Sequence, residues 1–151
     1  MAEQVEYEVT KAIIVVVGAT NHYLMSMKRD PGSSNDSKLE FLGGRMEADD
    51  PHPVAGIVRE LAEEEATGRL ADIVQARSPL HVQQQIQTAM HYLFPLQITE
   101  SDFKQLRHDP LESYGFQLVN SHQLQRCDQS YTRKTNRIIE MLDLPVARTG
   151  T

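Results

Sequence analysis

This sequence of 151 residues has a single cysteine, no long apolar run and no excess of positive charge. Cys127 is the single cysteine, which rules out an intrachain disulfide framework and a metal site built from several thiolates. The apolar run Ala12 to Val17 is too short for a secretory signal or a membrane span. The first residues, MAEQVEYE, are acidic. We therefore expect a cytoplasmic protein with no membrane partner.

The charge balance limits the partners that the chain can bind. Lysine and arginine number 15 against 21 acidic residues, which gives a formal net charge of −6. Binding to long nucleic acids depends on clustered Lys and Arg, so this balance argues against such a partner. It does not exclude a nucleotide-sized anion held through a metal ion. The length and a hydrophobic content of 40% predict one globular domain over residues 1–151.

The most informative stretch runs from residue 39 to residue 68, LEFLGGRMEADDPHPVAGIVRELAEEEATG. It predicts a strand, a turn at the glycine pair Gly43 and Gly44, and then a helix. One face of this helix carries an apolar stripe. Glu65 would extend that stripe, so we expect the helix to end or lift away there. The stripe consists of Val54, Val58, Leu61 and Ala62.

Glutamates gather on another face of the same helix. Glu60, Glu63 and Glu64 are spaced i, i+3 and i+4, and Arg59 lies one turn before Glu63, where it can orient that side chain. Since Glu64 lies opposite Leu61 on the helical wheel, we expect its side chain outside the core. Carboxylates that repel one another are either a solvated helix face or ligands of a hard cation such as Mg²⁺. Both interpretations stand at this point.

The residues before the helix favour the second interpretation. Gly44 followed by the run R-E-L-A-E-E at residues 59–64 resembles the Nudix hydrolase signature, G-x5-E-x7-R-E-U-x-E-E-x-G-U, where U is aliphatic. Glu47 stands where many members have a glutamate after the glycines. The chain departs from the pattern in having Asp50 at the first acidic position, one extra residue within 51–53, and Ala66 in place of the closing glycine.

The resemblance implies an α/β fold, a Nudix-type α/β/α sandwich with a mixed β-sheet. It implies a pyrophosphohydrolase that uses Mg²⁺ or Mn²⁺ to cleave the diphosphate bridge of a small-molecule nucleoside diphosphate derivative. The resemblance implies that Glu60, Glu63, Glu64 and the Gly44 carbonyl are metal ligands and that Arg59 fixes the glutamates. It implies Glu112 or Glu63 as the general base, with Glu100 as the runner-up. It places Arg29, Glu47 and Asp50 at the substrate.

Three questions stay open at the sequence level. One alternative is a catalytically inactive Nudix-fold module that binds nucleotides, and another is an interaction protein whose acidic helix is only solvated. No secondary motif selects a substrate within the superfamily, and the few aromatic residues, 6% of the chain, single out none for base stacking. The sequence also leaves open whether the chain forms a homodimer.

Periodicity and turn residues predict the remaining elements. Residues 5–17 and 22–28 are expected to form a β-hairpin, and residues 38–42 a third strand that ends at the glycine turn. Asp49 or Asp50 is expected to cap the glutamate helix, with His52 exposed. We also expect a strand at 70–77, a strand or helix at 80–87, and a strand at 89–98. In the last of these, Pro95 is expected at an edge or bulge and His91 is expected to be solvent-facing or partly buried. The remaining expectations are a helix at 101–107 capped by Ser101, a strand and a small helix within 111–125, and an amphipathic helix at 135–144.

Overall fold

The computed structural model describes residues 3–125 and 130–142, so Cys127 and residues 143–144 of the last predicted helix lie outside the described part. No helix within these residues is long and apolar enough to cross a membrane. In chain order the elements are β1 (Tyr7–Val17), β2 (His22–Lys28), β3 (Leu39–Glu40), β4 (Leu42–Arg45), α1 (Pro53–Glu64), α2 (Arg69–Arg77), β5 (Val82–Ile86), β6 (Ala89–Thr99), α3 (Glu100–Lys104), β7 (Ser113–Val119), α4 (Ser121–Gln125) and α5 (Arg133–Leu142).

The seven strands form one mixed sheet with β1 near its centre. β1 runs parallel to β6 along its full length and antiparallel to β2 and β4, which confirms both the mixed sheet and the predicted hairpin. The main path of the sheet has the order β3-β2-β1-β6-β5, with β4 added beside β1 and β7 beside β2. Pro95 lies beyond the part of β6 that pairs with β5. Its nitrogen, which has no N–H to donate, therefore lies at an edge of the sheet, as expected.

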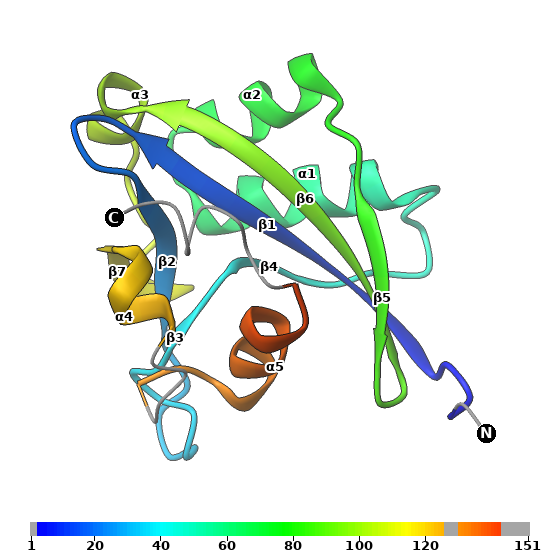
Figure 1. Ribbon diagram of the computed structural model, residues 1–151. Helices are drawn as coiled ribbons and strands as arrows, with labels where there is room; N and C mark the ends of the chain where they lie inside the picture. The colour runs from blue at the N-terminus through cyan, green and yellow to red at the C-terminus, as the bar shows by residue number, and fades with distance from the viewer. Residues whose placement is uncertain (1–2, 126–129, 143–151) are drawn as a thin grey trace.

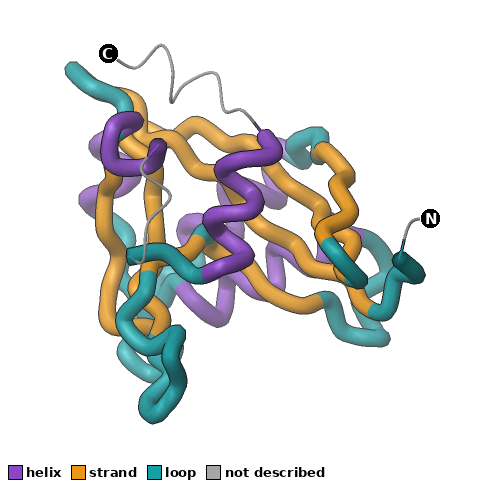
Figure 2. The backbone as a smooth tube through the Cα atoms, turned by 60° about the horizontal axis from the view of Figure 1, so that its bottom comes forward, coloured by secondary structure: helices purple, strands orange, loops and turns teal. Residues whose placement is uncertain are grey.

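Helices cover both faces of the sheet because the central strand is apolar on both sides. Ile14 and its neighbours on one face of β1 pack against α1 and α2, whereas Ile13 and its neighbours on the other face pack against α5. Figure 1 shows the sheet between α1 and α2 on one side and α5 on the other, and Figure 2 shows a helix in front of the strands with the remaining layer behind them. The predicted α/β/α sandwich is therefore confirmed.

The expected strand at 70–77 is wrong, because this segment forms helix α2. Gly68 precedes the helix in a left-handed conformation with φ of 78°. Leu70, Ala71 and Val74 are buried together against α1, with the i, i+1, i+4 spacing of a helix face. The β-branched pair Ile73-Val74 suggested a strand, but the buried positions follow the helical period.

The glycine pair does not form the predicted turn. Gly43 and Gly44 lie inside β4, opposite Lys11 and Thr10 of β1, so the expected third strand is two short strands on either side of Phe41. Gly43 has φ of 131°, and a Cβ there would overlap the Thr10 carbonyl oxygen. The chain turns later, where the Asp50 N–H donates to the Glu47 carbonyl at 3.0 Å.

Several local expectations also change. Helix α1 is capped by His52, whose Nδ1 accepts from the Ala55 N–H at 3.2 Å, and not by Asp49 or Asp50. His52 is exposed, as predicted. Ala62 is exposed, because the face that α1 buries runs through Gly56, Ile57 and Leu61.

The second half of the chain holds further differences. Helix α3 is capped by Thr99 in a capping box with Asp102, and not by Ser101. His91 is fully buried in β6, which rules out the predicted partial exposure. The ambiguous segment at 80–87 contains strand β5.

Candidate active site beside strand β4

The glycines of β4 let the carboxylates of α1 approach the strand backbone. A Cβ on Gly44 would lie 2.6 Å from Glu60 Oε2, so a larger residue would displace this carboxylate. The Gly43 N–H donates to both carboxylate oxygens of Glu64, at 3.1 and 3.4 Å. Two neighbouring strand residues therefore each contact one glutamate of the Nudix-like run.

Both of these glutamates are partly withdrawn from water. Burial raises the pKa of Glu60. It raises the pKa of Glu64 to about 8, although the Lys11 ammonium and the Gly43 N–H act in the opposite direction. Glu64 is not among the buried residues of the core, as expected, but its side chain is half-buried against β4. The surroundings therefore do not fully offset the negative charge that these two carboxylates carry when both are ionised.

Arg59 holds the other acidic side chains together. Its guanidinium donates to both oxygens of Asp50, from Nε at 3.1 Å and from Nη2 at 3.0 Å. Nη1 donates to Glu60 Oε1 and to Glu63 Oε1, each at 3.1 Å, and lies 3.3 Å from Glu47 Oε1. The hydrogen bonds between Arg59 and Asp50 lower the pKa of Asp50 and raise the pKa of Arg59. The predicted role of Arg59 in fixing glutamates agrees with this geometry.

Asp50 and Glu47 therefore have structural partners where substrate contacts were predicted. The Asp50 carboxylate accepts from the Glu47 N–H at 2.8 Å in addition to its contacts with Arg59. A further Arg59 hydrogen bond reaches the Arg45 carbonyl at 3.1 Å. This network joins the end of β4 to α1 across the segment that contains the extra residue of the Nudix-like pattern.

The donor set suits a hard divalent cation only in part. Within the described residues, no group of three or more His, Cys, Asp or Glu side chains is arranged to hold a metal. Glu60 and Glu64 lie at β4, whereas the exposed Glu63 is turned to Arg59, and the Gly44 carbonyl accepts from Thr10 Oγ1 at 3.4 Å. Two half-buried carboxylates with raised pKa values and a nearby carbonyl are the oxygen donors that Mg²⁺ prefers.

Glu65 has a structural role beyond the helix end that the sequence predicted there. It ends α1, as expected, and is fully buried. Its carboxylate accepts from the Arg107 N–H at 2.9 Å, the Thr67 N–H at 3.0 Å, the Thr67 hydroxyl at 2.7 Å and the Leu70 N–H at 3.3 Å. Burial acts to raise the pKa of Glu65, but these hydrogen bonds together lower it. Its position on the apolar stripe was the available signal.

The loop that carries Glu112 is tied to the end of α1. The Asp109 N–H donates to the Glu64 carbonyl at 3.0 Å, and the Glu112 N–H donates to the Asp109 carbonyl at 2.9 Å. Arg29 donates to the Pro110 carbonyl of the same loop. Glu100, the runner-up for the general base, packs instead against Gly18 at the far end of β1. The structure therefore favours Glu112 over Glu100 by position.

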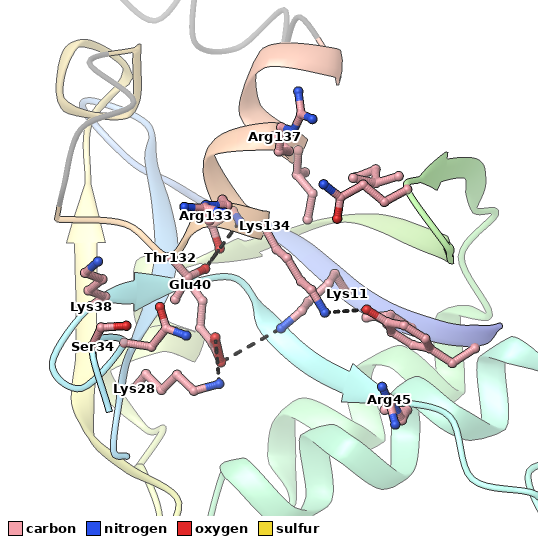
Figure 3. Close-up of a pocket in the computed structure, with 17 residues that line it drawn as sticks. Lys11, Lys28, Ser34, Lys38, Glu40, Arg45, Thr132, Arg133, Lys134 and Arg137 are labelled. Atoms are coloured by element: carbon pink, nitrogen blue, oxygen red, sulfur yellow. Dashed lines mark hydrogen bonds and ion pairs between the residues drawn. The ribbon is translucent and has the colours of Figure 1, made fainter. Parts of the chain in front are cut away.

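A pocket of about 570 Å³ lies on the other side of β4, between the sheet and α5. The sequence analysis missed it. Figure 3 shows the cationic side chains that line it, which come from the sheet strands, the loop before β3 and α5. Glu40 is the carboxylate among its described lining residues. We call it the basic pocket, and its cationic residues are Lys11, Lys28, Lys38, Arg45, Arg133, Lys134 and Arg137.

Comparison with known proteins identifies the fold. No protein-family model and no curated protein sequence matches the chain. Solved structures do match. A MutT protein from Methanosarcina mazei Go1 is 13% identical with a TM-score of 0.64, and 95% of this chain covers 96% of that one. A mutT/nudix family protein from Listeria innocua is 12% identical with a TM-score of 0.61 and coverages of 93% and 94%.

A third solved structure, an Ap4A hydrolase binary complex from C. elegans, is 8% identical with a TM-score of 0.55 and coverages of 91% and 95%. At such low identity these matches establish the arrangement of strands and helices. The chain therefore has the Nudix fold, as the resemblance in residues 44–64 implied.

Proposed function

We propose that this protein is a pyrophosphohydrolase that cleaves the diphosphate bridge of a nucleoside diphosphate linked to another group. The observation that carries the proposal is the pair Glu60 and Glu64, half-buried against the glycines of β4 with raised pKa values. Uncompensated buried carboxylates on a Nudix fold fit a site whose charge a divalent cation offsets. The hydrolase named among the structural neighbours supports the same reaction class.

The reaction needs charge compensation, because water must attack a phosphorus surrounded by anionic oxygens. Bound Mg²⁺ or Mn²⁺ supplies that compensation and acidifies water. In this chain Glu60, Glu64 and the Gly44 carbonyl would hold the ion, and Glu63 would join them on release from Arg59. Arg59 positions Glu60 and Glu63 through hydrogen bonds that also reach Asp50.

Proton transfer is assigned to the loop beside α1. Glu112 is exposed in that loop, whose backbone is fixed to the Glu64 carbonyl through Asp109. An exposed carboxylate at this position can accept the proton of the attacking water. Arg29, predicted at the substrate, contacts the Pro110 carbonyl and lies 5.7 Å from the Tyr114 ring, so it supports this loop. Glu63 is the alternative base, and its bond to Arg59 makes it less available.

A specific observation favours a second candidate, a Nudix-fold module that binds nucleotides without cleaving them. Arg59 engages Glu60 and Glu63, and within the described residues three acidic side chains do not converge on one point. This candidate predicts nucleotide binding that is indifferent to Mg²⁺.

A substrate panel with and without metal separates the two candidates. Nucleoside diphosphate sugars, dinucleoside polyphosphates and nucleoside triphosphates are incubated with Mg²⁺, with Mn²⁺ or with chelator, and products sensitive to phosphatase are scored. The proposal predicts turnover of at least one substrate that disappears in chelator. Turnover at the same rate in excess chelator, or binding without turnover across the panel, would contradict it.

A further inference from the structure

The basic pocket carries a formal charge opposite in sign to that of the whole chain. Its described lining holds seven cations and one carboxylate, a formal charge of +6, on a chain whose formal net charge is −6. Nearly half of the 15 Lys and Arg residues of the chain therefore face one concave region. Like charges gathered in this way repel one another, and a bound anion removes that cost.

The cations of the pocket differ in their partners. Lys11 and Lys28 share Glu40, at 3.9 and 3.7 Å. No hydrogen bond or ion pair joins the side chains of Lys38, Arg133 or Arg137 to another residue in the described part of the chain. Three cations from two separate segments are thus available to an incoming ligand (Figure 3).

Aromatic surface for a nucleobase is scarce in the pocket. Tyr7 is the aromatic residue of the described lining, and the Arg45 guanidinium lies 4.0 Å from its ring centroid. Lys134 Nζ lies 4.9 Å from the same ring and donates to the Tyr7 hydroxyl at 2.6 Å. Base stacking on an open aromatic face strengthens nucleotide binding in other proteins. Because the described lining offers no such face, charge is the main basis of recognition.

The pocket and the carboxylates of α1 are linked through the backbone of β4. The Arg45 side chain lines the pocket while its carbonyl accepts from Arg59. Lys11 Nζ donates to the Gly43 carbonyl at 3.4 Å, and the Gly43 N–H donates to Glu64. Both regions therefore contact β4, the basic pocket from the α5 side and the carboxylates from the α1 side.

We propose that the basic pocket binds phosphate groups other than the scissile diphosphate, so that the substrate is a multiply phosphorylated small molecule recognised by charge and not by its base. This inference rests on the proposed function for the site of cleavage. A phosphomonoester carries about −1.5 to −2 charges at pH 7, so the lining matches about three such groups. Arg and Lys from α5 and the sheet supply the donors that phosphate oxygens accept.

Binding without turnover tests the inference first. Calorimetric titration in chelator uses tripolyphosphate, inorganic phosphate, AMP and a ten-nucleotide RNA as probes. The variant Arg133→Gln/Arg137→Gln removes two exposed charges from the pocket, and Lys38→Gln removes one from a different segment. The matched control, Arg69→Gln/Lys104→Gln, removes two exposed charges from α2 and α3, away from the pocket.

We expect tripolyphosphate to bind more tightly than phosphate or AMP, and the pocket double variant to weaken it by about 10–100-fold, the usual effect of losing charge-assisted hydrogen bonds. Lys38→Gln should weaken binding by a smaller factor, and the control should change it less than about threefold. Equal weakening in pocket and control variants, no binding of tripolyphosphate, or tighter binding of the RNA would overturn the inference.

Turnover then separates this inference from the proposed function. With Mg²⁺, a dinucleoside tetraphosphate should have a higher kcat/KM than a nucleoside diphosphate sugar, and the pocket double variant should abolish the difference through KM. If both substrates are cleaved equally well and the double variant changes neither KM, the proposed function stands and this inference fails. If tripolyphosphate binds as expected but nothing is cleaved, the inference survives as a binding site and the proposed function fails.

Discussion

The two sides of β4 carry side chains of opposite charge. On the α1 side, Glu60 and Glu64 are drawn against the strand, and burial raises their pKa values. On the α5 side, cations line an open pocket, and several of them have no side-chain partner among the residues that the structure describes. The net charge of the chain hides this separation, because the excess of acidic residues elsewhere outweighs the basic pocket. Under our proposals, catalysis takes place on the α1 side and substrate capture on the α5 side.

The same contrast appears between two consecutive residues. Glu65 is buried, yet four hydrogen-bond donors, three of them backbone N–H groups, lower its pKa. Glu64 has one backbone N–H and nearby carboxylates, and its pKa rises to about 8. Burial acts to raise the pKa of both carboxylates, and only at Glu65 do the hydrogen bonds together outweigh it.

The largest expected effect tests the catalytic side. Glu112→Gln should lower kcat by roughly 10²–10⁴-fold, the usual contribution of a general base, with KM little changed. Glu100→Gln is the control, because Glu100 packs against Gly18 at the other end of β1. Steady-state kinetics on the best panel substrate measures both. A normal kcat for Glu112→Gln together with a large loss for Glu100→Gln would move the base to the hairpin end of the sheet.

The next effect concerns the close approach of α1 to β4. Gly43→Ala places a Cβ on the Thr10 carbonyl at a φ of 131°, so we expect a loss of about 3 kcal/mol or more in the free energy of unfolding. Gly68→Ala has a φ of 78° but no atom within 4 Å of the added Cβ, so it should lose only about 1 kcal/mol. Thermal or urea unfolding of both variants checks this. Equal losses would mean that contact with β1 is not what restricts position 43 to glycine.

Glu65→Gln should destabilise the fold by about 2–4 kcal/mol, because an amide cannot accept all the hydrogen bonds that converge on this buried carboxylate. Since the pKa of Glu65 is lowered in the folded state, the advantage of the wild type is complete at pH 7 and is lost as the pH falls below about 4. Urea unfolding of both proteins at pH 7 and pH 3 measures the difference. An unchanged difference at the two pH values would show that packing, not ionisation, explains the effect.

Much of the fold was accessible from sequence because its signals are local or periodic. The apolar run of β1, the hairpin to β2 and the helix of residues 53–64 follow from patterning and turn residues. The segment 70–77 was misread because its apolar residues fit either period, and only packing against α1 decides between them. The glycine pair was misread because pairing with Lys11 and Thr10 is a long-range contact.

The site was less accessible for the same reason. A helical wheel places Glu60, Glu63 and Glu64 on one face, but it does not show that β4 covers Glu60 and Glu64 while Glu63 turns to Arg59. The basic pocket collects residues from β1, β2, β4, α5 and the loop before β3, which no window of sequence brings together. The run R-K-x-x-R at the start of α5 was its one compact signal.

The pH dependence of stability tests the central claim most directly, that Glu64 is a metal ligand on the acidic side of β4. Its folded pKa of about 8 lies above the ordinary value near 4.5, so stability is greatest below pH 4.5 and falls as the pH rises toward 8. Without metal at pH 8.5, Glu64→Gln should therefore be more stable than the wild type by up to about 4–5 kcal/mol, and at pH 5 the two should nearly coincide.

The deciding measurement is the Tm of both proteins at pH 8.5 with and without Mg²⁺, alongside hydrolysis of the best panel substrate. We predict that Mg²⁺ raises the Tm of the wild type, leaves that of Glu64→Gln unchanged, and supports turnover by the wild type alone. A Glu64→Gln protein that gains the same stability from Mg²⁺ and hydrolyses at the wild-type rate would contradict the account.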